Sequence, residues 1–338
     1  MDPGEFWAWS LAALGLAGAG TWLARAYALR RQLIDLPGER RSHQAATPRG
    51  GGIAIVAVLL AAMAWLAWRA PGDAVELGFM AAGLVLVAGV GWIDDHRALP
   101  ALPRLLTHVL AAVLLCVGLW HGGAGPLDLL TAFLAVVVLT NVWNFMDGIN
   151  GIAASQAALA AAVYAVFAGK GLAFWLAVAL AAAAIGFLPF NFPRARIFLG
   201  DVGSGALGYM LAALLAAVGL GTPMPTRLLL LWPVSVFLLD ASLTLLSRML
   251  DGERWWQPHT RHAYQAWARR RGHPRVTAAY AVATAGASAA ALALRSFSLL
   301  VIVLCYAALL ALGGMAWTLL RDRCMDKRHA PPRDGQPR

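Results

Sequence analysis

Charged side chains are scarce in this sequence. Asp, Glu, Lys and Arg make up 13% of its 338 residues, whereas hydrophobic residues make up 60%. Soluble domains are about one quarter charged, and a soluble domain of this length could not bury so much apolar surface. The composition therefore excludes a soluble globular protein and predicts a polytopic membrane protein. Spans of about 20 residues use up the length and leave no room for a separate soluble domain.

Cysteine and internal repetition are also lacking. Three cysteines, Cys116, Cys305 and Cys324, stand alone, so neither a disulfide framework nor a metal-ligand spacing can be made from them. No internal repeat is evident, which argues against a transporter built from duplicated halves. The first residues, MDPGEF, lack the basic region of a cleaved signal peptide. We therefore expect the first apolar run to be a retained span that enters with its N-terminus outside.

Apolar stretches bounded by Gly, Pro or charge predict eleven membrane-spanning helices in an all-α bundle. They lie at roughly residues 5–26, 52–70, 77–93, 104–120, 127–143, 151–168, 171–188, 203–220, 227–248, 275–293 and 297–320. With the N-terminus outside, the cytoplasmic segments are 27–51, 94–103, 144–150, 189–202, 249–274 and the C-terminal tail. We expect one integral-membrane domain over residues 1–320 and a charged, disordered tail over 321–338.

The distribution of basic residues supports this sidedness. Of the 27 Lys and Arg residues, only Arg69, Lys170, Arg227 and Arg295 lie on or beside the outside loops. The other basic residues lie in or next to the cytoplasmic loops, as the positive-inside rule requires. This bias explains the net charge of +10 more simply than nucleic-acid binding does. The predicted inner face also carries the polar clusters, so the function belongs to that face.

The first polar cluster is GWIDDH, which contains Asp94 and Asp95. Carboxylates at a membrane edge are costly and indicate function by default. Two adjacent negative charges repel each other unless a cation or a proton relieves them. Mg²⁺ suits such a place, because it prefers oxygen ligands and commonly bridges carboxylates to substrate phosphates. A solvated acidic pair at the end of a helix is the alternative.

The second cluster, FLGDVGSG, contains Asp201 at the start of an apolar run. Its glycines let the backbone approach a ligand, and the amides at a helix N-terminus bind anions. Asp201 can therefore hold a cation while nearby N–H groups face a phosphate. The alternative is that Asp201 is only the N-cap of the helix.

The third cluster, NVWNFMDGING, combines three asparagines with one aspartate. Their amides offer both donors and acceptors, as recognition of a nucleobase or a sugar requires. Spacing by three places most of them on one helical face. The residues are Asn141, Asn144, Asp147 and Asn150.

The fourth cluster, QPHTRHAYQ, contains His259, Arg261 and His262. In a helix both imidazoles would point the same way, and the arginine would bind phosphate. A zinc site would need a third and a fourth ligand, which the spacing does not supply.

Asp240 lies within a span, where an ion pair, a helix bracket and catalysis all remain open. A basic Gly/Pro loop over residues 34–56 offers further cations to anions, and together the clusters predict a magnesium-dependent site for phosphate chemistry.

The order of these motifs is similar to that of a known family. From Asp35 to His262 the chain reads D-x-P-x-x-R-x-x-H…P-x-x-GG, then DD, N-x-x-N-x-x-DG-x-x-G, F-x-GD-x-GS and a His-rich loop. This pattern resembles the polyprenyl-phosphate N-acetylhexosamine-1-phosphate transferases. The resemblance implies transfer of a sugar-1-phosphate from a UDP-sugar to undecaprenyl phosphate, with release of UMP. It also implies a bacterial inner-membrane enzyme whose active site faces the cytoplasm.

The resemblance also implies roles for individual residues. Asp201 would hold Mg²⁺, or Mn²⁺ in its place, and Asp94 and Asp95 would act on the lipid phosphate or the metal. The residues expected in catalysis are Asp94, Asp95, Asp201, His259 and His262, the first three also as metal ligands. The residues expected to bind substrate are Asn144, Asp147, Asn150, Asn191, Phe198, Arg261, Thr47 and His43. Of these, Phe198 would stack on uracil, and Arg261 would engage the diphosphate or the sugar.

Three departures from the family's motifs narrow the substrate. Ala98 replaces a third acid after the DD pair, and Asn150 replaces the second acid of DGxDG. The loop HTRHAYQ lacks the triple histidine of the peptidoglycan enzyme, which argues against a muramoyl-pentapeptide donor. The chain looks more like the transferases that initiate O-antigens from UDP-N-acetylglucosamine or from 6-deoxy relatives.

Two mechanisms and one rival function stay open. We favour a single displacement, in which the lipid phosphate attacks in line and Asp94 positions it. A double displacement through an aspartyl intermediate is the alternative. A transporter or flippase for a phosphorylated solute would use the same cationic loops, but it requires polar groups deep within the spans. The sequence allows a homodimer without deciding it.

Overall fold

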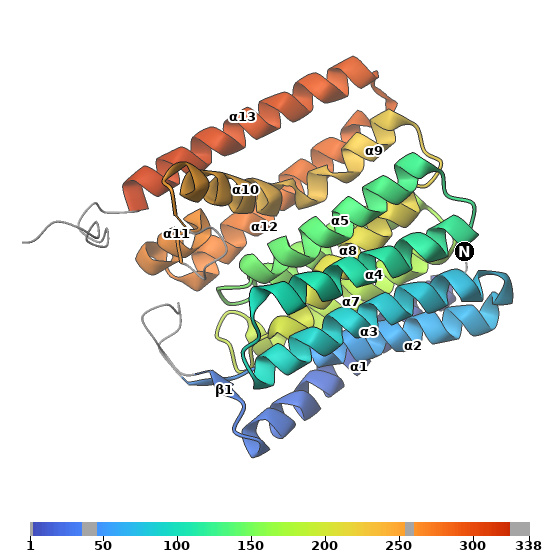
Figure 1. Cartoon of the computed structure of the whole chain (residues 1–338), viewed down its shortest axis with the longest axis horizontal. Coiled ribbons are helices and arrows are strands. Elements are labelled where there is room, and N and C mark those ends of the chain that lie inside the picture. The colour runs from blue at the N-terminus through green and yellow to red at the C-terminus, as the bar shows by residue number, and fades with distance from the viewer. Residues whose placement is uncertain (1–2, 36–45, 254–259, 325–338) are drawn as a thin grey trace, which may run out of the picture.

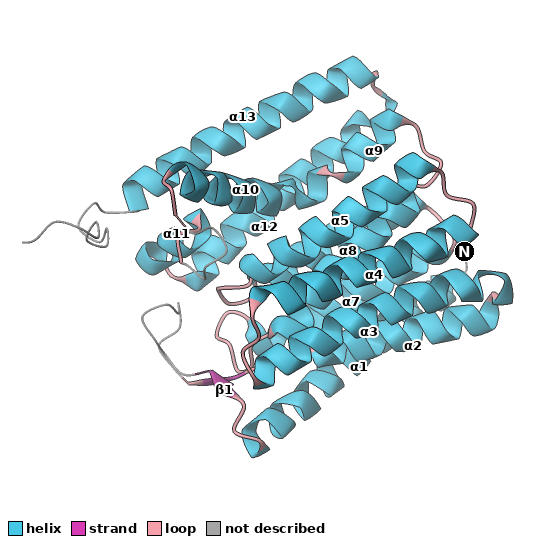
Figure 2. Cartoon of the chain, in the orientation of Figure 1, coloured by secondary structure: helices cyan, strands magenta, loops and turns pink. Residues whose placement is uncertain are grey.

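The computed structural model describes residues 3–35, 46–253 and 260–324, and its secondary structure is almost entirely α-helical (Figures 1 and 2). Its long helices run roughly side by side in one bundle, as the all-α prediction required. The helices are α1 (Pro3–Arg30), α2 (Ile53–Arg69), α3 (Ala74–His96), α4 (Ala101–His121), α5 (Pro126–Phe145), α6 (Ile152–Ala168), α7 (Leu172–Asn191), α8 (Asp201–Gly219), α9 (Met224–Leu230), α10 (Ser235–Leu250), α11 (Ala263–Arg271), α12 (His273–Ala293) and α13 (Leu299–Cys324).

Each of the eleven predicted spans is helical. Within the described residues, nine helical segments are long and apolar enough to cross a membrane, which confirms a multi-pass membrane protein. Helices α2 and α6 are also apolar, but each has 17 residues, the lower limit for a span. Which side of the membrane each end faces stays a prediction. Helix α13 extends to Cys324, past the predicted end of the domain at residue 320.

Helix α8 forms the centre of the bundle. It packs against α3 and α5, and nearly all of its residues are buried. Its small residues let the neighbouring helices approach closely: a Cβ at Gly208 would lie 2.4 Å from the carbonyl oxygen of Leu139 in α5. Gly91 of α3 does the same, because a Cβ there would lie 2.4 Å from the carbonyl oxygen of Asp201. These contacts bring the C-terminal end of α3 against the N-terminal end of α8.

The structure departs from the predicted pattern in three places. The span predicted over residues 227–248 is broken at a 3-10 turn, Trp232–Val234, because Pro233 cannot continue an α-helix. The predicted loop 249–274 contains the short helix α11. Two short strands, β1 (Ile34–Asp35) and β2 (Thr47–Pro48), pair antiparallel ahead of α2.

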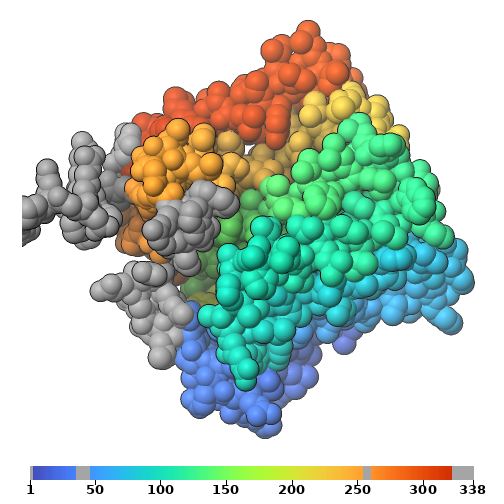
Figure 3. Space-filling model, viewed as in Figure 1, coloured from blue at the N-terminus to red at the C-terminus, as the bar shows by residue number. Residues whose placement is uncertain are grey.

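The polar clusters gather at one end of the bundle. Figure 1 shows β1 and α11 at the same end, on the left of the view, with the N-terminus at the opposite end. The C-terminal end of α3 and the N-terminal end of α8 also meet at that end. We call this the site end, defined by β1, β2, α11, the last turn of α3 and the first turn of α8. Figure 3 shows the molecule in the same orientation in space-filling form, with the site end on the left.

Candidate active site

Asp95 joins two helices at the site end. It lies in the last turn of α3, is 3% exposed, and accepts hydrogen bonds from the first backbone amides of α8. Its Oδ1 lies 3.0 Å from the amide of Asp201, and its Oδ2 lies 3.2 Å from the amide of Val202. The first amides of a helix have no partner within the helix, and a carboxylate there is favoured by the helix dipole. Asp95 therefore sets the position of Asp201.

Asp201 is the first residue of α8. Gly200 is the N-cap and has φ +77°, so the alternative in which Asp201 serves only as the N-cap is wrong. A Cβ at Gly200 would lie 2.5 Å from Oδ2 of Asp95, which explains why this turn requires a residue without a side chain. The Asp201 side chain is thereby free of a capping role and is 34% exposed.

Arg104 brings Asp94 and Asp201 together. It lies in the first turn of α4, and its Nη1 donates to Oδ2 of Asp94 at 3.0 Å and to Oδ2 of Asp201 at 3.3 Å. The amide of Leu99 donates to the other oxygen of Asp94. One cation thus serves two carboxylates from different helices. The sequence analysis missed Arg104, whose only signal is a lone cation at the start of an apolar run.

Arg49 closes another side of the same site. It donates to the carbonyl oxygen of Asp95 and, at 3.4 Å, to that of Asp94. Its Nε lies 3.8 Å from Oδ1 of Asp95. Arg49 immediately follows strand β2, so these contacts hold the two-stranded ribbon against the end of α3. Arg49 is thus a residue of the predicted basic loop that the structure places at the site, and its binding of a substrate anion stays a prediction.

Asp147 lies in the turn between α5 and α6. Among the described residues, no hydrogen bond or ion pair to its carboxylate is found. Burial, together with the negative charges of Asp201 and Asp95, raises its pKa well above the usual range for an aspartate. The nearby Asn144 donates from Nδ2 to the hydroxyl of Ser204 in α8 at 3.1 Å. This bond ties the end of α5 to the first turn of α8.

Asn150 and Asn191 support the wall of the site. Asn191 is 4% exposed, accepts the amide of Gly151 on Oδ1 at 2.6 Å and donates to the carbonyl of Ile197 at 2.9 Å. Asn150 donates to the carbonyl of Pro193 at 3.1 Å. Both amides therefore join the turn after α5 to the loop before α8. The structure shows both side chains in these supporting hydrogen bonds. Their contact with the nucleotide stays a prediction.

These elements enclose a cavity of about 200 Å³, which we call the acidic cavity. It is lined by Asp35, Arg49, Asp95, Asn144, Asp147, Gly148, Ile149, Asn150, Asn191, Phe198, Leu199, Gly200, Asp201, Gln265 and His273. The lining includes Phe198, and its stacking on a base stays a prediction. It also includes Gln265 and His273, which the sequence analysis missed. Gln265 belongs to α11, a helix that was not predicted, and His273 is the first residue of α12, which follows it.

The remaining predicted residues lie elsewhere or outside the described part. His259 and His43 fall outside the described residues. Thr47 is buried in β2 and does not line the cavity. Arg261 pairs with Glu253.

His262, the N-cap residue of α11, is buried, and its Nδ1 lies 3.8 Å from Oδ1 of Asp240. It stacks on Phe145 at a ring distance of 6.4 Å and does not line the cavity. Its predicted catalytic role, like that of Arg261 in substrate binding, stays a prediction.

Asp240 supports α11 from inside the bundle. It accepts the backbone amides of Ala263 at 3.0 Å and Tyr264 at 3.1 Å. Three side chains also donate to it: the Tyr280 hydroxyl at 2.7 Å, the Thr244 hydroxyl at 3.1 Å and the Trp317 indole at 3.2 Å. Of the roles left open by the sequence, the structure supports the helix bracket.

Helix α11 is thereby placed over the turn that carries Asp147. The hydroxyl of Tyr264 donates to the carbonyl of Phe145 at 3.0 Å, and burial raises its pKa well above the ordinary range. A Cβ at Gly148 would lie 2.3 Å from this hydroxyl and 2.9 Å from the side-chain nitrogen of Gln265. The glycine after Asp147 therefore lets α11 close one side of the acidic cavity.

The charges around the cavity suit a cation. Its lining carries the carboxylates of Asp35, Asp95, Asp147 and Asp201 and the guanidinium of Arg49. Arg104 and Asp94 lie next to it, in contact through Arg104 with Asp201. A diphosphate alone would meet an excess of negative charge there. Among the described residues, no three His, Cys, Asp or Glu side chains form a complete ligand set. Mg²⁺ does not require one, because it typically takes one or two carboxylates together with substrate phosphates and water.

The fold and the site together define the class of protein. It is a helical membrane bundle with an acidic, amide-lined cavity at one end, and such a cavity suits phosphate chemistry. Residues 77–219 match the model of glycosyl transferase family 4. A decaprenyl-phosphate N-acetylglucosaminephosphotransferase of Mycobacterium leprae (strain TN) is 36% identical over 241 residues, which cover 60% of this chain and 60% of the relative.

Two further relatives match over similar lengths. A probable undecaprenyl-phosphate N-acetylglucosaminyl 1-phosphate transferase of Bacillus subtilis (strain 168) is 28% identical over 272 residues, 72% of each chain. A phospho-N-acetylmuramoyl-pentapeptide-transferase of Synechococcus sp. (strain JA-3-3Ab) is 35% identical over 232 residues, 60% of this chain and 66% of the relative. The chain thus spans about 60% of the length of the mycobacterial relative it matches.

Proposed function

We propose that the protein transfers an N-acetylhexosamine-1-phosphate from a UDP-sugar to undecaprenyl phosphate. The observation that carries this proposal is the position of Asp201, held at the N-terminus of α8 by Asp95 and joined to Asp94 through Arg104. The family and the names of the matched relatives support the same reaction. We further propose that the site end faces the cytoplasm in a bacterial inner membrane.

The reaction forms one phosphorus–oxygen bond and breaks another. An oxygen of the lipid phosphate bonds to the phosphorus that carries the sugar, and the bond from that phosphorus to the bridging oxygen of UMP breaks. The lipid phosphate has a second pKa of about 6, so it needs no strong base. Asp94 would position this phosphate, while Arg49 and Arg104 would reduce the repulsion between the two anionic substrates.

Mg²⁺ would be held by Asp201 with Asp94, and Asp95 would support them from behind through the backbone of α8. When bound, the ion supplies charge that neutralises the diphosphate of the donor and the oxygen of the leaving UMP. Mn²⁺ would fit the same oxygen ligands. A cation at this position would also relieve the repulsion by Asp201 and Asp95 that, together with burial, raises the pKa of Asp147.

The wall opposite Asp201 would receive the nucleotide. Phe198 offers an aromatic ring, and the amides of Asn144 and Gln265 offer donors and acceptors. We propose UDP-N-acetylglucosamine as the donor, since the relatives in Mycobacterium leprae and Bacillus subtilis carry that sugar in their names. The product would start a lipid-linked envelope glycan such as an O-antigen.

The test is an assay of UMP release by the purified, full-length protein in detergent. Undecaprenyl phosphate, Mg²⁺ and each of a panel of UDP-N-acetyl sugars are supplied, and UMP and the lipid diphosphate are quantified. We expect stoichiometric formation of both products from one sugar and none after chelation of the metal. Lipid movement across liposomes without any UMP would instead support a transporter. A phosphoryl-sugar adduct trapped on Asp94 would replace single displacement by double displacement.

A further inference from the structure

The segment that carries Asp147 has no regular secondary structure of its own. Residues 146–151 connect α5 to α6 and form neither a helix nor a strand. Such a connection takes its shape from the groups that bind its backbone amides and carbonyls. The hydroxyl of Tyr264 binds the carbonyl just before the segment, and Asn191 binds the amide of its last residue. The position of Asp147, between these two attachments, therefore depends on what binds the rest of the segment.

Asn150 receives a further attachment from the first turns of α12. Its backbone amide donates to Nδ1 of His273 at 3.4 Å, and its carbonyl accepts a hydrogen bond from the Thr277 hydroxyl at 2.8 Å. The two side chains are four residues apart, so they lie on the same face of the helix. One helix face thus binds both backbone polar groups of a single residue, which fixes the orientation of the segment as well as its position.

The side chain of Asn150 extends this connection to the loop before α8. Its Nδ2 donates to the carbonyl of Pro193 at 3.1 Å. An ionised carboxylate has no hydrogen to donate and would repel that carbonyl oxygen. The asparagine that stands in place of the second acid of the DGxDG motif is therefore matched by a contact that a carboxylate cannot make. Asn150 joins α12, the segment of Asp147 and the loop that leads to Asp201.

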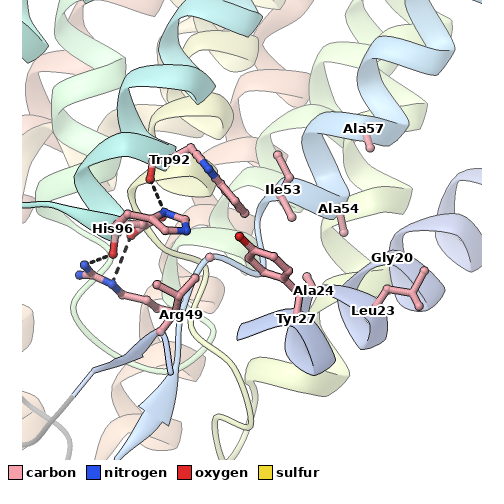
Figure 4. A pocket seen from close by; sticks show the side chains of 13 residues that line it. Gly20, Leu23, Ala24, Tyr27, Arg49, Ile53, Ala54, Ala57, Trp92 and His96 are labelled. Carbon is pink, nitrogen blue, oxygen red and sulfur yellow. Dashed lines mark hydrogen bonds and ion pairs between the residues drawn. The ribbon is translucent and has the colours of Figure 1, made fainter. Parts of the chain in front are cut away.

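Helix α12 contributes to one of the two cavities at the site end. His273, its first residue, lines the acidic cavity. The neighbouring cavity, of about 300 Å³, lies between α1, α2 and α3 and shares Arg49 with the acidic cavity (Figure 4). Its lining comes from those three helices together with Leu33, Arg49 and Gly50. A change in the first turns of α12 should therefore act on the acidic cavity and leave the neighbouring cavity unaltered.

We propose that His273 and Thr277 are positioning residues, which hold Asp147 at the wall of the acidic cavity through the backbone of Asn150. This proposal rests on the proposed function, because it gives the two residues a part in binding the donor of that reaction. The imidazole accepts at Nδ1, so the neutral ring carries its proton on Nε2. Loss of either contact leaves the segment freer to move, and the wall that would receive the nucleotide then loses its fixed shape.

The two contacts can be removed with little change in side-chain size. Thr277→Val removes the hydroxyl, and Thr277→Ser retains it. His273→Leu removes the acceptor at the Nδ1 position, and His273→Asn retains one. Thr284→Val is the matched control, because Thr284 is also buried in α12 but donates its hydrogen bond to Gln156, inside α6. We measure kcat, KM for the UDP-sugar, KM for undecaprenyl phosphate and thermal unfolding in every variant.

We expect Thr277→Val and His273→Leu to raise KM for the UDP-sugar about tenfold, which corresponds to the loss of about one buried hydrogen bond. KM for undecaprenyl phosphate should stay unchanged, since Asp94, which would position the lipid phosphate, is held by Arg104 and not by α12. Thr277→Ser and His273→Asn should stay close to the wild-type values.

The control separates positioning from stability. Thr284→Val should lower the temperature of unfolding about as much as Thr277→Val does, without changing KM for the UDP-sugar. An unchanged KM in Thr277→Val would overturn the proposal. An equal rise of KM in Thr277→Val and Thr284→Val would also overturn it, because the effect would then belong to the stability of α12 in general.

Hydrogen exchange distinguishes a failure of this proposal from a failure of the proposed function. Amide exchange of residues 146–151 is followed by mass spectrometry in the full-length protein in detergent, without substrates, because local opening sets its rate. Faster exchange in Thr277→Val, with wild-type exchange in Thr284→Val, supports the positioning role even if no sugar yields UMP. Wild-type exchange of this segment in Thr277→Val overturns the role, while UMP release still supports the reaction.

Discussion

Two buried aspartates in this protein perform the same structural task in contrasting surroundings. Asp95 and Asp240 are each 3% exposed, and each binds the first amides of a helix other than its own. Asp240 receives three further donors from neutral side chains, and Nδ1 of His262 lies 3.8 Å from it, so its negative charge is stabilised from several sides. Asp95 has Asp94, Asp201 and Asp147 around it, and among the described residues Arg49 is the one cation close by.

This difference in surrounding charge distinguishes Asp240, which is a structural support, from Asp95, which lies at the candidate reaction site. At Asp240 a carboxylate with many donors fixes α11, and no further charge is required. At Asp95 the same kind of contact fixes α8, but the surrounding carboxylates leave a surplus of negative charge. Such a surplus persists only where a cation, a proton or a ligand relieves it. The helix placed by Asp95 carries the candidate metal ligand, whereas the helix placed by Asp240 closes the wall.

The largest effect should come from Asp201→Asn, which removes the proposed metal ligand without altering side-chain size. We expect kcat for UMP release to fall about 10²–10³-fold, the loss typical of one electrostatic contributor to a transition state. Thermal unfolding should change little, since Asp201 does not cap its helix. Full magnesium-dependent turnover in this variant would refute the assignment of the metal to Asp201.

Asp240→Asn tests the support. The new side-chain amide would point an N–H group at donors that now bind the carboxylate of Asp240. We therefore expect the unfolding free energy to fall by about 2 to 3 kcal/mol. Thermal unfolding in detergent measures this loss. Asp251→Asn is the control, because Asp251 is 46% exposed on its side chain near the same helix. Equal stability of the two variants would show that Asp240 is not the bracket for α11.

Asp95→Asn tests the difference between Asp95 and Asp240 directly. It weakens the cap of α8 but also removes one of several mutually repelling charges, so the stability should change less than in Asp240→Asn. Turnover should fall about 10- to 100-fold, as is typical when a group that orients a metal ligand is altered. The measurement is kcat alongside thermal unfolding in both variants. A larger stability loss at Asp95 than at Asp240 would reverse the comparison.

Arg104→Gln tests the bridge between Asp94 and Asp201. Without this cation the two carboxylates should attract Mg²⁺ more strongly, so the Mg²⁺ concentration for half-maximal activity should fall. The kcat should drop about tenfold because charge on the substrates is less well compensated. Arg97→Gln, at an exposed arginine just after α3, should leave both values unchanged. An increased Mg²⁺ requirement in Arg104→Gln would contradict the bridge.

The smallest effect concerns the pH dependence of stability without metal. The raised pKa of Asp147 means that the folded protein binds this proton more tightly than the unfolded chain does. Unfolding free energy should therefore fall as pH rises from the ordinary aspartate range through the raised pKa. Asp147→Asn should abolish this part of the slope, and Asp73→Asn, at an exposed carboxylate, should not. Melting curves in a chelator from about pH 5 to about pH 8 measure the slopes.

The positions of the helices could be predicted from the sequence. Every apolar stretch became a helix, because burial in hydrocarbon and the internal pairing of backbone groups act within a window of about 20 residues. The polar clusters around Asp94, Asp147 and Asp201 were equally visible, since each stands out from its own neighbours. The resemblance in motif order agrees with the family model that residues 77–219 match.

Other features required contacts between distant residues. Pro233 is only a weak signal for the break in the span predicted over residues 227–248. The short helix α11 has too few hydrophobic residues to be predicted by a search for apolar stretches. The packing of α1 against α2 and of α2 against α3 was not visible at all. Each of these depends on what packs beside a segment and not on the segment alone.

The sequence by itself determined the class of protein, the helices and the chemistry of the residues near the site. Only the tertiary structure decided that Asp95 holds the helix of Asp201, that Arg104 joins two carboxylates, and that Asp240 supports α11. The physical reason is the range of the interactions. Hydropathy and helix formation are read along the chain, whereas a carboxylate that caps a helix 106 residues away is selected by the packing of the whole bundle.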